Sequence, residues 1–198
     1  MKKSRRLLLF PLLLVVLLGA AACGGGGGDS AAEGEIETVI EAAATSTDPA
    51  NCGKYSTLQF MEQTTGAKGA KAEKSCEEDA GEPGQPESVS VTNIEIDGSS
   101  ATADAAFEGG NFGGQALSVA LVEEEGNWKL DEFKGFAEFD AKKLTETLVK
   151  QFEEEGSIEP KVISCIAEGL EKLDESEYEK LVVEQETQPI VEIAEGCE

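Results

Sequence analysis

The sequence predicts an α+β fold in which helices are followed by a four-stranded antiparallel sheet and then by a small C-terminal helical unit. Three observations lead to this prediction. Between residues 35 and 78, some segments have apolar side chains at helical spacing, and others have a composition that favours helix. Residues 88–133 contain alternating apolar and polar segments that turn signals separate. From residue 140 onward the apolar spacing is helical again.

The first expected helix, 35–44, places Ile36, Val39 and Ile40 on one side. Further helical turns are expected at 48–55, 57–61 and 67–78. The Gly- and Pro-rich stretch 81–86 then ends the helical region.

The expected strands are 88–96, 101–107, 116–123 and 128–133. In the first of them Asn93 interrupts the alternation of apolar and polar residues, which indicates a β-bulge. Asp97-Gly98 is a tight-turn signal between the first two strands. A loop or wide hairpin at 109–114 joins the second and third strands, and 125–127 turns the chain into the fourth, which predicts an antiparallel meander.

The C-terminal residues 137–198 predict a separate helical unit. Asp140 is the expected N-cap of its first helix, Gly156 ends that helix, and Pro160 opens the next. The sequence Ser-Glu-Tyr-Glu at 176–179 predicts a capping box with Ser176 as N-cap, and a last helix follows Thr187. A unit of this size is marginally stable by itself, so a covalent closure makes physical sense.

Composition excludes several classes of function. The chain of 198 residues has a formal net charge of -24 and no histidine, and its only arginines are Arg5 and Arg6. Neither a Ser-His nor a Cys-His pair is therefore available, and no imidazole can bind a metal. A body without arginine lacks the guanidinium group that binds phosphate with two hydrogen bonds. Because an acidic surface repels polyanions, we expect no nucleic-acid partner.

Residues 1–22 are predicted to be a lipoprotein signal peptide. Basic side chains within residues 2–6 precede the apolar stretch 7–22, which is shorter than the roughly 20 residues that span a bilayer. The small residues before Cys23 resemble the lipobox of bacterial lipoproteins, although Ala20 stands where leucine is more usual. The resemblance implies that Cys23 is acylated and becomes the mature N-terminus. An ordinary cleaved signal peptide and an uncleaved anchor are the alternatives.

Residues 23–34 are predicted to be the lipidated cysteine and a flexible Gly-rich tether. The glycine run lacks the Gly-Lys-Ser/Thr ending of a phosphate-binding loop and follows no strand. A tether of this composition reaches about 18 Å. The expected location is therefore extracytoplasmic, with the body attached to the cell membrane through the lipid.

Five cysteines leave an even number once Cys23 is acylated. Four cysteines allow three pairings, and we expect Cys52–Cys76 and Cys165–Cys197 because each pair lies within one compositional block. Closing each loop is worth about 3.5 kcal/mol in the chain-entropy model. Free thiols or a zinc site would be the alternative, but the cysteines lack the close spacing usual for zinc ligands.

The order of these features resembles a known fold family. The chain contains, in order, a lipobox, a helix, a Cys-containing helical segment and a sheet that closes on Glu-Gly-Asn-Trp-Lys-Leu-Asp-Glu-Phe at 125–133. This order is similar to that of small lipid-anchored proteins, common in actinobacteria, with the nuclear transport factor 2-like cone fold. The resemblance covers residues 35–136 and implies a curved, cone-like sheet around a cavity. Catalytic members of that family place an Asp–His or Asp–Tyr pair in the cone. No such residue can be carried over, since the only tyrosine in this range is Tyr55.

The candidate pocket residues are Tyr55, Asp104, Phe107 and Phe112, the last two in or beside a Gly-rich loop at 109–114. The acidic runs 77–79, 123–125 and 153–155 lack the spacing of a calcium loop and are interpreted as solubilising faces. We therefore expect no catalytic residue, no metal and no cofactor. The predicted function is a non-enzymatic binding or accessory module at the cell envelope, with a small molecule or an envelope protein as partner. A small-molecule isomerase or dehydratase, or an interaction scaffold, remains the alternative.

Overall fold

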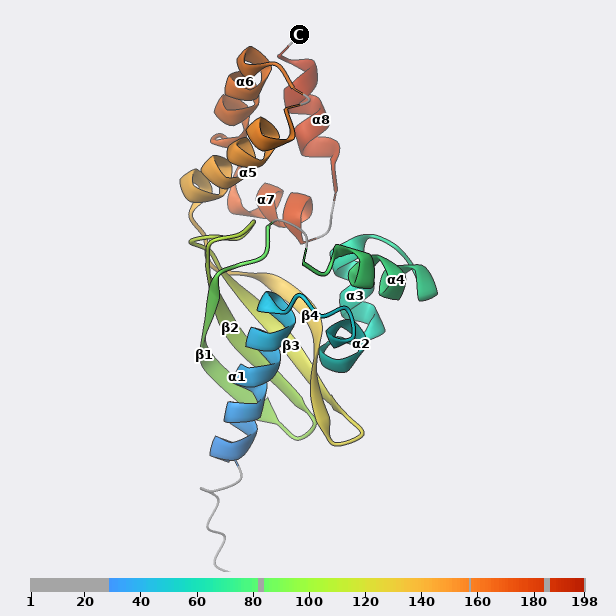
Figure 1. The fold of residues 1–198 in the computed structure, drawn as a ribbon. Coiled ribbons are helices and arrows are strands. Elements are labelled where there is room, and N and C mark those ends of the chain that lie inside the picture. The colour runs from blue at the N-terminus through green and yellow to red at the C-terminus, as the bar shows by residue number, and fades with distance from the viewer. Residues whose placement is uncertain (1–28, 82–83, 157, 184–185, 198) are drawn as a thin grey trace, which may run out of the picture.

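The computed structural model describes residues 29–81, 84–156, 158–183 and 186–197 (Figure 1). The predicted signal peptide 1–22 and Cys23 lie outside these residues. Four helices come first: α1 (Asp29–Thr45), α2 (Asn51–Tyr55), α3 (Leu58–Thr65) and α4 (Ala70–Asp79). The strands are β1 (Ser88–Asp97), β2 (Ser100–Glu108), β3 (Ala116–Glu124) and β4 (Asn127–Glu138). The helices α5 (Ala141–Glu155), α6 (Pro160–Leu170), α7 (Glu175–Val182) and α8 (Gln188–Glu195) follow. The predicted α+β class and element order are confirmed.

Helix α1 carries the predicted apolar stripe and starts earlier than expected. Ile36 and Ile40 are almost fully buried, and Val39 is 8% exposed. Their side chains join the core that covers one face of the sheet. The helix begins at Asp29, so residues 29–34, which we expected in the tether, are helical in the structure.

Of the next three helices, α2 and α4 are joined by the predicted disulfide between Cys52 and Cys76. Cys52, Met61 and Ala72 form a small buried cluster around it. Thr57 caps α3 because its hydroxyl accepts a hydrogen bond from the Phe60 N–H. The segment at Asp48 forms a turn, and α2 starts only at Asn51.

The four strands form one antiparallel sheet in the order β1-β2-β3-β4, as the meander predicts. The predicted bulge is present: the register of β1 on β2 shifts between Thr92 and Glu95, and Asn93 has a φ of 52°. Gly98, at φ 63°, turns β1 into β2. On β2 the alternate residues Ala101, Ala103, Ala105 and Phe107 are buried, so the opposite set faces solvent.

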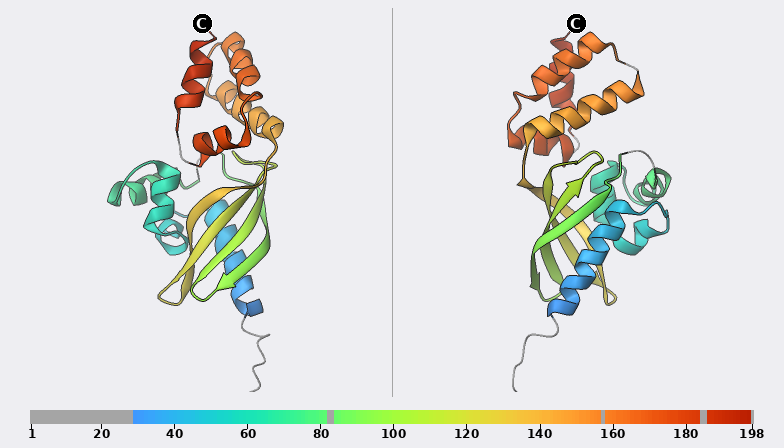
Figure 2. Two further views of the ribbon diagram at one scale, coloured as in Figure 1. Left: turned by 180° about the vertical axis from the view of Figure 1, so that it is seen from behind. Right: turned by 60° about the vertical axis from the view of Figure 1, so that its left-hand side comes forward.

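Strand β4 continues past the expected residue 133 to Glu138, with register shifts against β3. The sheet curves so that α1 lies across one of its faces (Figure 2). Gly135, at φ 140°, is needed on this strand, because a side chain there would meet the carboxylate of Glu179 from α7.

The free edge of β4 is occupied by groups from neighbouring helices. The Thr57 N–H donates to the carbonyl of Leu130 at 2.8 Å. The side-chain amide of Gln63 pairs with both backbone groups of Phe133, donating to its carbonyl at 3.0 Å and accepting from its N–H at 2.8 Å. The Glu179 carboxylate accepts from the Phe136 N–H at 3.3 Å. These backbone groups therefore have partners although β4 is an edge strand.

The C-terminal helices enclose a second core of Leu144, Ile166, Leu170 and Tyr178. Asp140 caps α5 as predicted, and Gly156 ends it in the left-handed conformation. The capping box of α7 uses Asp174 and Glu177, so our assignment of the N-cap to Ser176 was wrong. The predicted disulfide Cys165–Cys197 ties α6 to the end of the chain after α8.

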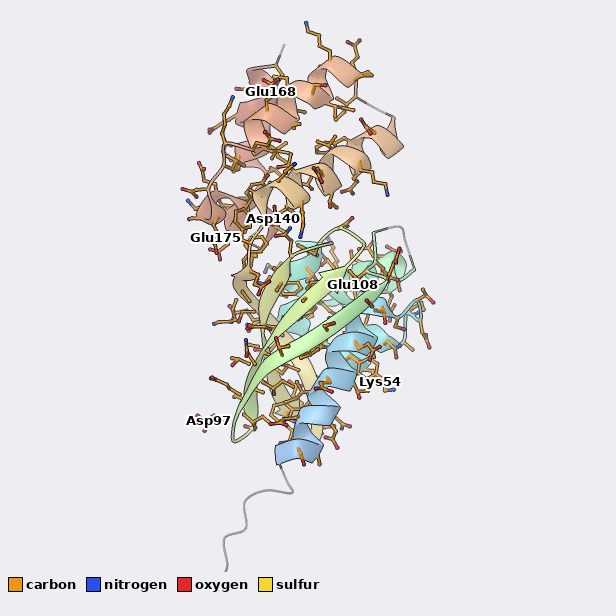
Figure 3. All side chains as sticks on the ribbon, turned by 90° about the vertical axis from the view of Figure 1, so that its left-hand side faces the viewer. Lys54, Asp97, Glu108, Asp140, Glu168 and Glu175 are labelled. Atoms are coloured by element: carbon orange, nitrogen blue, oxygen red, sulfur yellow. A yellow bond between two sulfur atoms is a disulfide. The ribbon has the colours of Figure 1, made fainter. Side chains whose placement is uncertain are left out.

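The two cores meet where the sheet passes into α5, close to Asp140 (Figure 3). The amide of Gln115, 1% exposed, accepts from the Asp140 N–H at 2.8 Å and donates to its carbonyl at 3.1 Å. Phe136 packs against both cores, and Phe139 contacts both Phe136 and Tyr178. The Tyr178 and Thr145 hydroxyls share a buried hydrogen bond of 2.6 Å.

Candidate functional site

A cavity of about 500 Å³ lies between the sheet and the helices α1 to α4. Its volume falls within the roughly 300–1,000 Å³ of ordinary small-molecule sites. α1 supplies Ile40, Ala43 and Ala44 to the wall, and the strands supply Ala105, Val119 and Leu130. The Cys52–Cys76 disulfide lines it as well, so the helices that form its outer wall are held together covalently.

Phenylalanine rings make one continuous wall of this cavity. Phe107 of β2 contacts Phe112 with ring centroids 5.8 Å apart, and Phe112 contacts Phe133 of β4 at 6.2 Å. Phe133 in turn contacts Phe60 of α3 at 4.9 Å. The tilted ring pairs have the geometry that aromatic side chains favour. An apolar molecule entering the cavity would therefore contact aromatic rings along this wall.

The loop after α1 is held in place by its own polar groups. The Ser46 hydroxyl accepts hydrogen bonds from the Asn51 side chain and the Asp48 N–H. The Gln85 amide donates to the Ser46 carbonyl at 3.1 Å. All four residues line the cavity, so its mouth is polar and preformed.

Ser56 is the one lining side chain whose burial is unusual for a hydroxyl. It is 6% exposed, and its hydroxyl forms no hydrogen bond with any residue that the structure describes. Ser56 is one of the residues that line the cavity, and no fully buried side-chain N or O atom of the described residues lacks a partner. A bound molecule could therefore hydrogen-bond to it.

The Gly-rich loop 109–114 forms part of the rim. The Asn111 N–H donates to the carbonyl of Gly84 at 2.9 Å. Gly110 has a φ of 65° and lies directly against the backbone of residues 84–86, where a side chain would not fit. These contacts hold the loop against the segment 84–86 and leave Phe112 facing the cavity.

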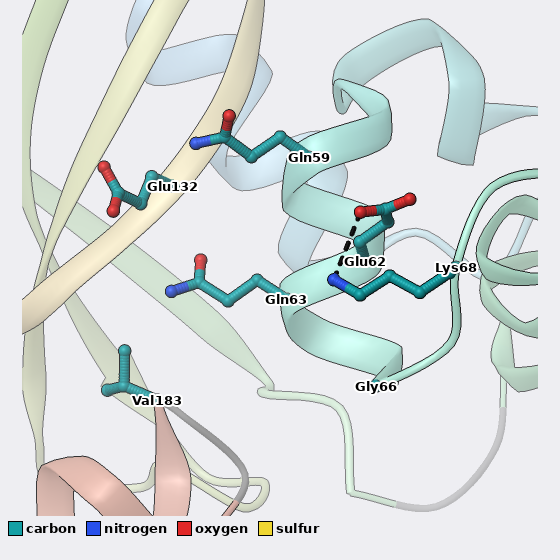
Figure 4. A pocket seen from close by; sticks show the side chains of 7 residues that line it. All are labelled: Gln59, Glu62, Gln63, Gly66, Lys68, Glu132 and Val183. Carbon is teal, nitrogen blue, oxygen red and sulfur yellow. Dashed lines mark hydrogen bonds and ion pairs between the residues drawn. The ribbon is translucent and has the colours of Figure 1, made fainter.

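A second hollow of about 420 Å³ lies between α3, β4 and Val183, and most of the residues that line it are polar (Figure 4). Glu62 accepts a hydrogen bond from the Gly69 N–H at 2.7 Å and pairs with Lys68 at 3.2 Å. The Gly69 N–H, and then Lys68, hold the pKa of the Glu62 carboxyl below its usual value. Gln63 is committed to the β4 backbone. Its polar groups therefore serve the fold, and the cavity behind the sheet is the better candidate site.

The structure brings together two of the four predicted pocket residues. Phe107 and Phe112 line the cavity in mutual contact. Tyr55 instead packs against the main core beneath the Lys54 ammonium, which lies 4.5 Å from its ring centroid. Asp104 lies between the buried Ala103 and Ala105, so its side chain points to the outer face, where it accepts a hydrogen bond from Asn93 at 2.7 Å.

Sequence reasoning did not select Phe60, Phe133 or Ser56 as site residues. Phe60 follows the helix cap at Thr57, and Phe133 ends the predicted last strand, but neither pattern indicates a shared pocket. Nothing in the local sequence distinguishes Ser56 from a loop residue on the surface. Only the packing of α3 on β4 shows that these residues line one cavity.

The chemical groups around the cavity suit binding. Its ionisable side chains are the exposed carboxylates of Asp48 and Asp79, and the two cysteines in its wall are joined in a disulfide. Within the described ranges, no three Cys, Asp or Glu side chains gather in a group that could hold a metal ion. Among the same residues, no helix is long and apolar enough to cross a membrane.

Comparisons with protein families, with curated proteins and with solved structures found no match to this chain. The architecture defines it as an α+β protein with a four-stranded antiparallel sheet and two disulfides. Disulfides indicate an oxidising, extracytoplasmic setting.

Proposed function

We propose that this protein is a non-enzymatic binding module that holds a small, largely apolar molecule in its cavity at the outer side of a cell membrane. The observation that carries the proposal is the cavity of about 500 Å³ with its wall of contacting phenylalanine rings. Burial of apolar ligand surface against such a wall contributes about 25 cal/mol per Å². The proposed fold is the nuclear transport factor 2-like cone, supported by the curved sheet, the helices across it and the cavity between them.

The attachment to the membrane is part of the same proposal. The small residues before Cys23 support acylation of that cysteine, and the described body begins soon afterwards at Asp29. The amino-terminal end of α1 and the C-terminal helices lie at opposite ends of the molecule (Figure 1). An anchor at Cys23 would therefore leave the helical unit farthest from the membrane.

Binding in the cavity is tested by introducing a large side chain on α1 that would fill it. Ala44 lines the cavity, whereas Ala42, on the same helix, does not. We expect native mass spectrometry of the mature protein, released from detergent in the gas phase, to show a bound small molecule in the wild type and in Ala42→Trp. The Ala44→Trp variant should lose it, because the indole occupies the space. An adduct that persists equally in both variants, or a wild type that retains no apolar molecule offered to it, would contradict the proposal.

The anchor is tested by Cys23→Ser. We expect this variant to lose the acyl group and to leave the membrane fraction of detergent-free extracts, or to remain uncleaved, as intact-mass measurement would show. Ser30→Ala, a change in the same region that keeps Cys23, serves as the control. A Cys23→Ser protein that is still acylated and processed would rule out the proposed anchor.

A further inference from the structure

We infer that the cavity selects an amphipathic cation, a molecule with an apolar body and an ammonium-like positive charge at the mouth. This inference rests on the proposed function, since it names the class of molecule that the same cavity would hold. It follows from the charges, the helix ends and the rings that surround the space.

The charges of the lining residues are of one sign. Asp48, in the loop after α1, and Asp79, the last residue of α4, both line the cavity and are exposed at its mouth. Among the described residues that line the cavity, none is a lysine or arginine. A carboxylate or phosphate headgroup would thus meet repulsion with no compensating cation, in a chain whose net charge is already -24.

Three helices contribute residues from their carboxyl-terminal turns to the lining of the cavity. Ala43 and Ala44 belong to the last turn of α1, Thr64 and Thr65 end α3, and the last turn of α4 contributes Cys76. Each helix end carries a partial charge of about -0.5, which favours a cation nearby. The helix α2 begins at the cavity and acts in the opposite sense, but it has only five residues, so fewer peptide dipoles add up in it.

The aromatic wall favours the same ligand class. Phe60, Phe112 and Phe133 line the cavity. The face of an aromatic ring carries the negative part of its quadrupole, so an ammonium over that face within about 6 Å of the ring centroid is attracted to it. Quaternary ammonium groups are recognised in this way, because they combine a positive charge with an apolar surface. The rings thus accept both parts of an amphipathic cation.

The Ser56 hydroxyl adds a hydrogen-bonding point inside the cavity. It is buried, lines the cavity and has no partner among the described residues. A ligand with a hydroxyl, ether or carbonyl group beyond its charged head would pair with it. The cavity volume of about 500 Å³ lies within the range of ordinary small-molecule sites. The ligand is therefore a compact amphiphile, well below the size of a two-chain lipid.

The test compares probes that share one octyl chain and differ in the headgroup: octyltrimethylammonium, octanol and octanoate. Binding is measured by calorimetry to the mature protein in phosphatidylcholine nanodiscs, with partition into empty nanodiscs subtracted. We expect the ammonium to bind at least tenfold more tightly than the alcohol, and octanoate to bind more weakly than either. Asp48→Asn with Asp79→Asn should bring the ammonium down to the affinity of the alcohol and leave the alcohol unchanged.

A matched control removes two carboxylates elsewhere. Asp97→Asn with Glu168→Gln makes the same change in net charge at exposed sites outside the cavity (Figure 3). It should keep the preference for the ammonium. Three results would overturn the inference without contradicting the proposed binding function. They are equal binding of the ammonium and the alcohol, tighter binding of octanoate, and a preference for the ammonium that survives Asp48→Asn with Asp79→Asn. Failure of all three probes to bind would overturn both.

Discussion

The sheet domain and the C-terminal helical unit each contain one disulfide, yet they rely on it differently. Twelve buried residues from α1, β2, β3 and β4 make the sheet core, and Cys52–Cys76 lies outside it, among α2 to α4. The helical unit has a core of four buried residues, and Cys165–Cys197 joins α6 to the segment just after α8. The disulfide therefore holds together the outer helices of the sheet domain, whereas in the helical unit it stabilises the packing of the whole unit.

Removal of each disulfide should separate these two roles and is the largest effect that we expect. Each disulfide closes a loop worth about 3.5 kcal/mol. In Cys165→Ala with Cys197→Ala, amide hydrogens of α5 to α8 should exchange freely while those of β1 to β4 stay protected. In Cys52→Ala with Cys76→Ala, protection should fall in α2 to α4 only. Hydrogen-exchange mass spectrometry distinguishes these patterns, and equal loss throughout the chain in both variants would show one cooperative unit.

The junction between the two regions gives the next largest effect. Gln115 is buried and pairs with both backbone groups of Asp140, whereas the half-buried Gln63 makes the same kind of pair with Phe133. We expect Gln115→Ala to destabilise the protein by about 3 kcal/mol, because a buried amide is lost and both backbone groups of Asp140 lose their partners. Gln63→Ala should cost about 1 kcal/mol, since water replaces the amide. Urea unfolding measures both values, and equal losses would mean that the junction is open to solvent.

Alkaline pH should lower the stability of the helical unit selectively, and by less than the changes described above. Burial raises the pKa of the Tyr178 hydroxyl, the hydrogen bond with Thr145 opposes this shift, and Glu171 adds to it. A raised pKa in the folded state contributes stability below the ordinary value of about 10, and this stability is lost as the pH rises through the folded pKa. Protection of α5 to α8 should therefore fall above that pH before protection of the sheet does.

The phenol itself reports this transition. With Tyr55→Phe, Tyr178 is the only tyrosine left in the chain. Its phenolate absorbance should appear above the ordinary pKa of tyrosine and coincide with the loss of protection in the helical unit. Phenolate formation at the ordinary pKa, with the helices still protected, would contradict this account.

Local signals predicted most of the fold because they act within a few residues. The interruption at Asn93, the turn at Gly98 and the cap at Asp140 each need only their immediate neighbours. The N-cap of α7 was misplaced because two overlapping patterns, beginning at Asp174 and at Ser176, both end in glutamate. The structure uses the first of them, and Tyr178 is then buried in the core.

The site was less predictable because it depends on packing between distant segments. Phe107 and Phe112 are close in sequence, and their neighbouring glycines were enough to select them. Phe60 and Phe133 meet only because α3 packs on β4, where Gln63 and Thr57 bond to the strand. Asp104 was a candidate by residue type, but the alternation of β2 directs it outward.

The occupied edge of β4 also matters for crowded surfaces. Exposed strand edges recruit strands from other molecules and seed aggregates. Proteins anchored side by side in a membrane would meet such edges often. On β4, Thr57, Gln63 and Glu179 already bond to the backbone at Leu130, Phe133 and Phe136, so an incoming strand would have to displace them. The groups that hold α3 and α7 in place, namely the Thr57 N–H and the side chains of Gln63 and Glu179, thus also protect this edge against self-association.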